Sequence, residues 1–165
     1  MKKKCEICGS NKLSKIIDLG KNPLCDDLID IKSKKKNNLY NIIISICKNC
    51  LTAYQNYEVE KKILFPKNYH YRARFTKDVL NGFKDIEKLS LFYLKKLKNK
   101  NILDIGCNDG SLLNFFKKHK ANTIGVEPTD AAKDAKKNGH NIYQEYFEKK
   151  TTNKIIKKYK KIDLI

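Results

Sequence analysis

Four cysteines near the start of the chain have the spacing of a metal site. They form two Cys-x-x-Cys pairs, Cys5 with Cys8 and Cys47 with Cys50. A two-residue gap lets both thiolates of one tight turn reach the same ion, and two such turns complete a tetrahedron. Zinc suits four thiolates, and four protein ligands leave no open position for a substrate. The pairs therefore predict a structural zinc site, while an iron–sulfur cluster with the same ligands stays open as an alternative.

Three further residues bear on this prediction. Gly9 follows Cys8 directly and allows a positive φ, which turns backbone amides toward the cysteine sulfurs. Cys25 and Cys107 lie outside both pairs, and we expect a surface or packing role for Cys25. A redox pair of the thioredoxin kind would need only one Cys-x-x-Cys beside a βαβ unit, so two pairs favour a metal site.

A second group of residues, from 101 to 113, reads as a buried strand, a glycine-bearing turn and a helix. Gly106 lets a ligand approach the backbone, Gly110 lets the helix pack closely on the strand, and free amides at the helix start offer hydrogen-bond donors. Asn108 stands where the dinucleotide fingerprint G-x-G-x-x-G requires a glycine, so we expect no pyrophosphate in this turn. A smaller ligand than a dinucleotide fits the pattern better.

Two acidic residues complete this second group. Glu127 ends the next predicted strand, where an acidic side chain can accept hydrogen bonds from both hydroxyls of a ribose. Taken singly, Glu127 also fits a surface carboxylate, and Asp104 fits a helix cap. Together with the turn they predict a site for an adenosine moiety. The candidate cofactor-binding residues are Asp104, Gly106, Asn108, Gly110 and Glu127.

The cysteine pairs lie in a β-rich region, residues 1–58. Its predicted strands cover residues 13–19, 39–46 and 51–57, and the cysteine pairs stand at their ends. The lysine-rich stretch 32–38 contains no apolar residue and is typical of a solvated loop. We expect a small zinc-ribbon-like domain, followed by a tyrosine-rich linker over residues 59–75.

The glycine turn lies in a region of alternating strands and helices, residues 76–165. A long helix is predicted first, with one apolar face made of Val79, Phe83, Ile86, Leu89, Tyr93 and Leu97. Strands at 102–105, 123–127, 142–143 and 162–165 then alternate with helices that begin near Ser111, Asp130 and Asn153. The predicted fold class is α/β, with a β-rich zinc domain before an incomplete Rossmann-like domain.

The chain is strongly basic, with a formal net charge of +18. Such a charge usually points to nucleic acid. Arg72 and Arg74 are the only arginines, however. Arginine is the residue that makes bidentate hydrogen bonds to phosphates and to the edge of guanine. Abundant lysine, asparagine and isoleucine match the composition that an AT-rich genome imposes. We therefore expect no nucleic-acid partner beyond weak nonspecific adhesion to RNA.

The sequence also predicts a cytoplasmic protein without a membrane partner. Its apolar runs, such as residues 42–44, are far shorter than the roughly 20 residues that cross a bilayer. The basic start of the chain runs into the first Cys-x-x-Cys pair, where a signal peptide would have an apolar stretch. Cysteines in the cytosol stay reduced and can serve as metal ligands.

The motifs LDIGCNDGSLL, from Leu103, and GVEPT, from Gly125, resemble those of the S-adenosylmethionine-dependent methyltransferases. The closest resemblance is to the sugar C-methyltransferase family with an N-terminal zinc domain. In that family a Cys-x-x-Cys pair, a segment like residues 19–23 and a second pair precede a tyrosine-rich linker, matched here by residues 69–72. The resemblance covers the whole chain.

The resemblance implies roles for several residues. Gly106 and Asn108 would border the methionine part of the cofactor, Asp104 would orient the loop, and Glu127 would hold the ribose. The family methylates a carbon of a nucleotide-linked deoxysugar after a base removes a proton beside a keto group. Linker tyrosines line the sugar pocket in that family, which implies catalytic candidates at Tyr69 and Tyr71, with His70 as a weaker one. Packing between domains is the alternative role for these aromatic residues.

The chain is shorter than the resemblance requires. The family has a larger sheet than the four strands expected here, and it adds a C-terminal domain of its own. Its main acid–base residues are expected just after the fourth strand, beyond residue 165. We therefore expect either a gene fragment or a second polypeptide that completes the fold, and little activity from this chain alone.

Two other functions stay open. A noncatalytic zinc ribbon that binds RNA or a partner protein would account for the charge, but not for Glu127. A methyltransferase with an RNA or protein side chain as acceptor would keep the same cofactor site.

Overall fold

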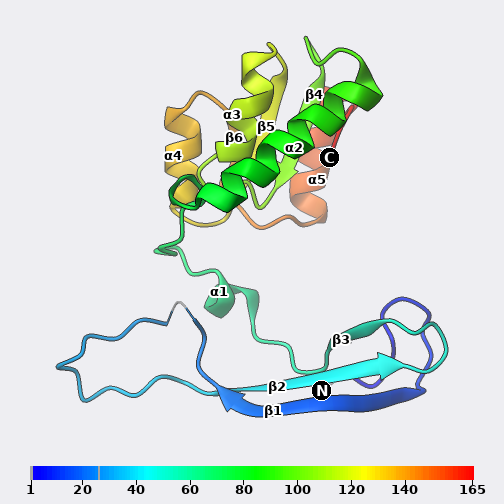
Figure 1. The fold of residues 1–165 in the computed structure, drawn as a ribbon, viewed down its shortest axis with the longest axis vertical. Helices are drawn as coiled ribbons and strands as arrows, with labels where there is room; N and C mark the ends of the chain where they lie inside the picture. Colours follow the sequence, from blue (N-terminus) through cyan, green and yellow to red (C-terminus); the bar gives the residue numbers. More distant parts are fainter. Residues whose placement is uncertain (1, 26) are drawn as a thin grey trace. The chain divides into compact units, whose positions relative to one another are not determined.

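The computed structural model describes residues 2–25 and 27–165. The chain divides into two compact units, of which unit 1 ends at Leu64 and unit 2 runs from Phe65 to Ile165 (Figure 1). None of the helices in the described ranges is long and apolar enough to span a membrane.

Unit 1 is built on a three-stranded antiparallel sheet. Its strands are β1 (Leu13–Asn22), β2 (Tyr40–Cys47) and β3 (Ala53–Gln55), in the order β1-β2-β3, and α1 (Lys61–Leu64) follows. The pairing of Leu13 with Cys47 places the second cysteine pair at the end of β2. The third strand is shorter than predicted because Leu51 belongs to the turn after Cys47 and has a φ of 60°.

This sheet encloses little apolar core. Among the described residues of unit 1, the buried apolar side chains are Cys5, Cys47 and Val59. Ile16, Ile17 and Leu19 of β1 are exposed, so burial of apolar surface gives this unit little stability.

Unit 2 is an α/β domain with a parallel sheet. The strands β4 (Asn101–Ile105), β5 (Asn122–Val126) and β6 (Asn141–Tyr143) lie in the order β4-β5-β6. The helices are α2 (Lys77–Leu94), α3 (Ser111–Lys118), α4 (Ala131–Lys137) and α5 (Lys149–Tyr159), and a short 3-10 helix, η1 (Ala73–Phe75), precedes them. The predicted α/β class, with a partial parallel sheet, is confirmed.

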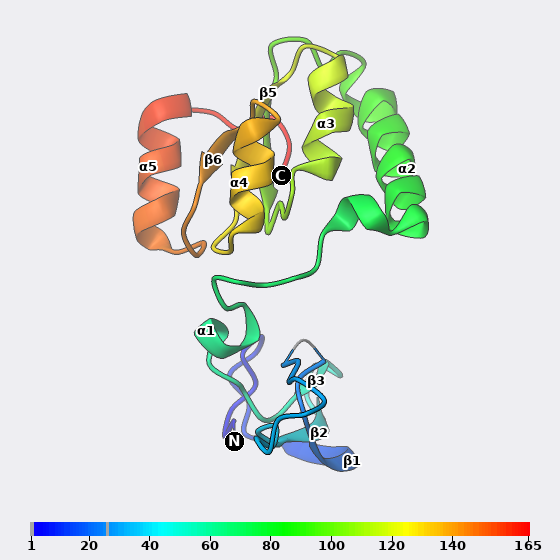
Figure 2. The same ribbon diagram turned by 90° about the vertical axis from the view of Figure 1, so that its left-hand side faces the viewer.

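Helices cover both faces of this sheet (Figure 2). Leu103 of β4 packs with Ile155 of α5, whereas its neighbour Ile102 packs with Phe116 of α3. Adjacent residues of one strand point to opposite faces, so the two clusters lie on opposite sides of the sheet. The predicted fourth strand is a single parallel bridge between Leu164 and Ile102. The strand order therefore reverses at β4, and ligands of open α/β sheets bind beside the carboxyl end of such a strand.

The predicted apolar face of the long helix is wrong in part. Ile86, Leu89 and Tyr93 are exposed, and the helix ends at Leu94, before Leu97. The helix has apolar residues on more than one face, and the face that packs on the core includes Leu91 and Leu94. Three- and four-residue steps alone cannot select between two such faces.

Candidate functional site

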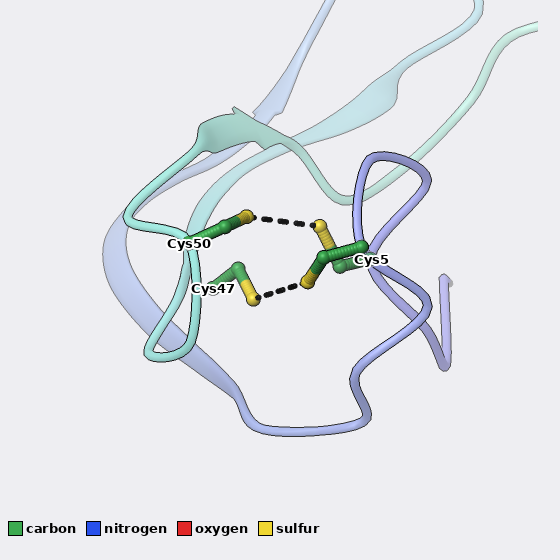
Figure 3. Close-up of side chains that lie close together, drawn as sticks. Cys5, Cys47 and Cys50 are labelled. Atoms are coloured by element: carbon green, nitrogen blue, oxygen red, sulfur yellow. Dashed lines mark hydrogen bonds between the residues drawn. The ribbon is translucent and has the colours of Figure 1, made fainter.

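The four cysteines predicted as metal ligands lie together in unit 1. Their sulfur atoms all lie within 4.8 Å of one another. Cys5 Sγ lies 3.6 Å from Cys50 Sγ (Figure 3). Cys8 Sγ lies 3.6 Å from Cys47 Sγ. A tetrahedral ion with Zn–S bonds of about 2.3 Å places its sulfurs roughly 3.8 Å apart. The cluster therefore fits one ion of this kind, whereas Cys25 is exposed and lies outside it.

Two equivalent loops hold these cysteines. The Gly9 amide donates to the Cys5 carbonyl at 2.9 Å, and the Leu51 amide donates to the Cys47 carbonyl at 2.8 Å. Both turning residues have a positive φ, 71° at Gly9 and 60° at Leu51. The positive φ predicted at Gly9 is confirmed. A leucine gives no sequence signal for the same turn in the second loop.

Hydrogen bonds to sulfur favour the thiolate form in the second loop. The hydroxyl and then the amide of Thr52 lower the pKa of the Cys50 thiol to about 6. The amide of Cys50 is the main cause that lowers the pKa of Cys47. Metal binding requires deprotonated thiols, so these hydrogen bonds prepare Cys47 and Cys50 for a cation.

The second candidate site is a cavity of about 400 Å³ in unit 2. It opens at the carboxyl ends of β4 and β5, where Gly106 and Glu127 both line it. Gly106 has a φ of 78°, and a Cβ atom at this position would meet nothing within 4 Å. The structure thus brings together the turn and the carboxylate that the sequence assigned to one ligand. The other lining residues are Phe65, Tyr69, Tyr71, Ala73, Val79, Phe83, Ile105, Asn108, Val126, Pro128, Tyr146 and Phe147.

The carboxylate of Glu127 is held by two backbone amides. Its Oε2 atom accepts a hydrogen bond from Asn108 at 3.1 Å, and its Oε1 atom accepts one from Thr129 at 2.9 Å. Glu127 as a whole is 5% exposed, and these hydrogen bonds fix its orientation at the cavity wall. Each carboxylate oxygen has a further lone pair that can accept a hydrogen bond from a ligand hydroxyl.

Asn108 connects the turn to the segment before α2. It has a φ of 49°, a conformation that asparagine tolerates better than most residues. Its Oδ1 atom accepts a hydrogen bond from the Ala73 amide at 3.1 Å, and its Nδ2 atom donates to the Tyr71 carbonyl at 3.2 Å. A glycine at position 108 could not make these side-chain contacts.

Asp104 lies near Glu127 but does not line the cavity. Burial, and then the charge of Glu127, raise the pKa of Asp104 to about 6. Two neighbouring carboxylates with little solvent make the negative form of Asp104 costly.

Substitution of Asp104 by asparagine is expected to stabilise unit 2 at neutral pH. A pKa raised on folding means that the neutral acid contributes full stability below the unfolded pKa, and that this contribution is lost as the pH rises through about 6. Asp104→Asn should therefore raise the free energy of unfolding by about 2 to 3 kcal/mol at pH 7.5, and by little at pH 4. Urea unfolding followed by helical circular dichroism at both pH values measures this. Equal stability of the wild-type chain and Asp104→Asn at pH 7.5 would refute the raised pKa of Asp104.

Gly110 has a different role from the predicted one. It does not line the cavity, and the atoms closest to it do not belong to β4, the strand before the turn. A Cβ atom there would lie 2.7 Å from Cδ2 of His140 and 3.0 Å from Cβ of Ala135 in α4. The close approach of the turn to the sheet occurs instead at Gly125, where a Cβ atom would lie 2.5 Å from Cys107 Sγ.

Gly110→Ala is expected to destabilise unit 2 by about 3 kcal/mol, because the left-handed backbone and the contact with α4 both oppose a side chain. Gly82→Ala in α2 is the matched control, since a Cβ atom at this position meets nothing within 4 Å. Removal of a glycine from a helix interior should stabilise by about 0.5 to 1 kcal/mol. Thermal unfolding of both variants measures the two effects, and a loss in Gly82→Ala as large as that in Gly110→Ala would contradict this account.

The three catalytic candidates of the linker differ in position. Tyr69 and Tyr71 line the cavity, whereas His70 is exposed and does not line it. Tyr69 packs edge-to-face against Phe65, with ring centroids 5.9 Å apart. The Tyr146 hydroxyl donates to the Phe65 carbonyl at 3.0 Å, which joins the segment after β6 to this aromatic wall. No pattern in the sequence pointed to Phe65 or Tyr146.

Comparison with known families gives a class to each part of the chain. A family model described as "Putative zinc binding domain" matches residues 5–65, and one described as "Methyltransferase domain" matches residues 70–165. The second model covers more than half of the chain, and the chain therefore belongs to the methyltransferase domain family. The two matches also follow the order that the resemblance to zinc-containing C-methyltransferases implied.

A relative of known class supports the same family. The C-methyltransferase NovU of Streptomyces niveus is 21% identical to this chain over 125 residues. The match covers 75% of this chain and 30% of NovU, so the chain spans less than a third of the length of this relative.

Proposed function

We propose that this chain binds S-adenosylmethionine in the cavity of unit 2 and acts in methyl transfer to a carbon of a nucleotide-linked sugar. The observation that carries the proposal is that the Gly106 turn and the Glu127 carboxylate line one cavity at the reversal point of the sheet. The match to the methyltransferase domain family supports the assignment of S-adenosylmethionine as the cofactor.

The residues around the cavity fit an adenosyl group. The oxygens of Glu127 can accept hydrogen bonds from the two ribose hydroxyls, and the open space at Gly106 admits the methionine part. Pro128 and Phe147 offer an apolar wall for the adenine ring. The cofactor supplies an electrophilic methyl group on a positively charged sulfur, and the aromatic faces of Tyr69 and Tyr71 suit a cation.

Two observations support the proposed sugar acceptor. The relative NovU is a C-methyltransferase, and the motifs around Gly106 and Glu127 resemble those of sugar C-methyltransferases. Hydroxyl groups of Tyr69 and Tyr71 would contact the sugar, with His70 as a weaker candidate. An RNA or protein acceptor is the competing assignment.

We propose that the base that deprotonates a carbon acid lies outside residues 1–165. Among the described residues that line the cavity, Glu127 is the one carboxylate and no histidine is present. Glu127 already accepts two backbone amides. Either a continuation of this chain or a second polypeptide that completes the site would supply the missing group. We also propose residues 59–75 as the linker between a domain of residues 1–58 and one of residues 76–165.

We also propose that the metal is zinc and that its role is structural. Four thiolates within 4.8 Å of one another match the ligand set of closed zinc sites. Unit 1 has few buried apolar side chains, so the ion would supply much of its stability. Cysteines kept as thiolates also agree with the predicted cytoplasmic location.

An equilibrium titration of the full chain with labelled S-adenosylmethionine tests the proposed cofactor. We expect saturable binding to one site, competition by S-adenosylhomocysteine, and no competition by NADH. Absence of saturable binding, together with salt-sensitive binding of RNA, would favour the noncatalytic zinc ribbon instead.

A further inference from the structure

The two arginines of this chain converge on one carboxylate. Of the 36 basic residues, only those at positions 72 and 74 are arginine. Arg72 Nε donates to Asp134 Oδ2 at 2.9 Å, and Arg74 Nη1 donates to the same oxygen at 2.9 Å. Asp134 lies in α4, so both arginines tie the segment before α2 to that helix.

Arg72 also organises the backbone of its own segment. Its Nη1 atom donates to the carbonyl oxygen of Tyr69 at 2.7 Å and to that of Tyr71 at 2.9 Å. One guanidinium group thus binds a carboxylate and the carbonyls of both tyrosines that line the cavity. A lysine ammonium donates all its hydrogen bonds from one nitrogen and cannot reproduce the planar guanidinium geometry.

Arg74 anchors the other end of the segment beside the glycine turn. Asp109 Oδ2 accepts the Arg74 amide at 3.1 Å and Arg74 Nη1 at 3.3 Å. The Asp109 side chain is 1% exposed, so its charge needs these donors. The neighbouring Asn108 binds the Ala73 amide and the Tyr71 carbonyl. Residues 69–74 are therefore fastened at both ends.

We propose that Arg72 and Arg74 are positioning residues of a strap, defined as residues 69–74, that forms one wall of the cavity. Tyr69, Tyr71 and Ala73 line the cavity from the strap, and Gly106 and Glu127 line it from the sheet. A strap detached from Asp134 would hold Tyr69 and Tyr71 less firmly against a bound ligand, so the ligand should dissociate faster. The nature of the ligand rests on the proposed function, whereas the strap itself does not.

Composition gives an independent reason to assign a role to these arginines. Every other cation in the chain is lysine, so lysine is the residue that its composition favours at a generic basic position. Both exceptions stand where several acceptors must be bound in fixed geometry. The arrangement explains why lysine would not serve here.

The test compares Arg72→Lys and Asp134→Asn with the wild-type full chain. Hydrogen exchange of the Ala73 and Arg74 amides, measured by NMR, reports on the strap, because these amides donate to Asn108 and Asp109. We expect exchange at both amides, and the dissociation rate of labelled S-adenosylmethionine, to increase about tenfold in each variant. Lys88→Ala, which removes the exposed ion pair with Asp85, is the control and should change both by about twofold or less.

Two results would overturn the strap. The first is unchanged exchange at Ala73 and Arg74 in both variants. The second is an increase shared equally by the amides of β4 and β5, which would mean that the arginines act on global stability. If the wild-type chain binds no S-adenosylmethionine, the proposed function fails, while the exchange data still decide the strap.

Discussion

Removal of the metal ion is expected to unfold unit 1 and to leave unit 2 folded. The buried apolar residues in the described part of unit 1 are two ligand cysteines and Val59. Structural zinc contributes about 10 to 16 kcal/mol in small domains, which is as large as the whole stability of an ordinary domain. Unit 2 has its own core on both faces of its sheet, so it should stay folded without the ion.

Chelation of the purified chain, followed by NMR of the β1–β2 amides, measures this loss. Cys47→Ser should have the same effect, and Cys25→Ser, an identical change at an exposed cysteine outside the cluster, should have none. Elemental analysis should give one zinc per chain, and visible absorption from iron and sulfide would assign a cluster instead. Persistence of the β1–β2 signals without metal would refute a structural role for the ion.

Glu127→Ala is expected to reduce the affinity for S-adenosylmethionine by about a hundredfold or more. Two hydrogen bonds from ribose to a buried, charged acceptor are worth roughly 3 kcal/mol or more in total, and about 1.4 kcal/mol changes a dissociation constant tenfold. The variant also frees the amides of Asn108 and Thr129, which loosens the turn. Glu127→Gln should cause a large part of the same loss of affinity. Its side-chain NH₂ group would face a backbone N–H donor, whereas the carboxylate oxygen at this place accepts a hydrogen bond.

Calorimetric titration of both variants measures the affinity. Glu145→Gln is the matched control, since Glu145 lies in the same unit and pairs with Lys154 outside the cavity. It should bind the cofactor as the wild-type chain does. If Glu127→Ala bound the cofactor with wild-type affinity, the Glu127 carboxylate would not be part of the binding site.

The sequence predicted those parts of the sites in which spacing along the chain determines geometry. The Cys-x-x-Cys pairs form equivalent turns, and the strand–turn–helix around Gly106 follows from a local pattern of glycine and apolar residues. Glu127 reaches the same cavity because neighbouring parallel strands end at the same edge of a sheet.

Other parts of the sites depend on contacts that no local pattern specifies. The pairing of Arg72 and Arg74 with Asp134 joins residues about sixty positions apart, and nothing near Asp134 marks it as their partner. Gly110 packs on α4, and its glycine pattern alone suggested a contact with the strand. Leu51 adopts a left-handed conformation that its residue type does not favour.

The crystal structure of this chain with S-adenosylhomocysteine tests the central claim most directly. We predict that both ribose hydroxyls lie within hydrogen-bond distance of the Glu127 carboxylate and that the amino-acid part lies over the turn at Gly106. A ligand bound elsewhere on the chain, or a ribose that does not contact Glu127, would contradict the assignment of this cavity to an adenosyl cofactor.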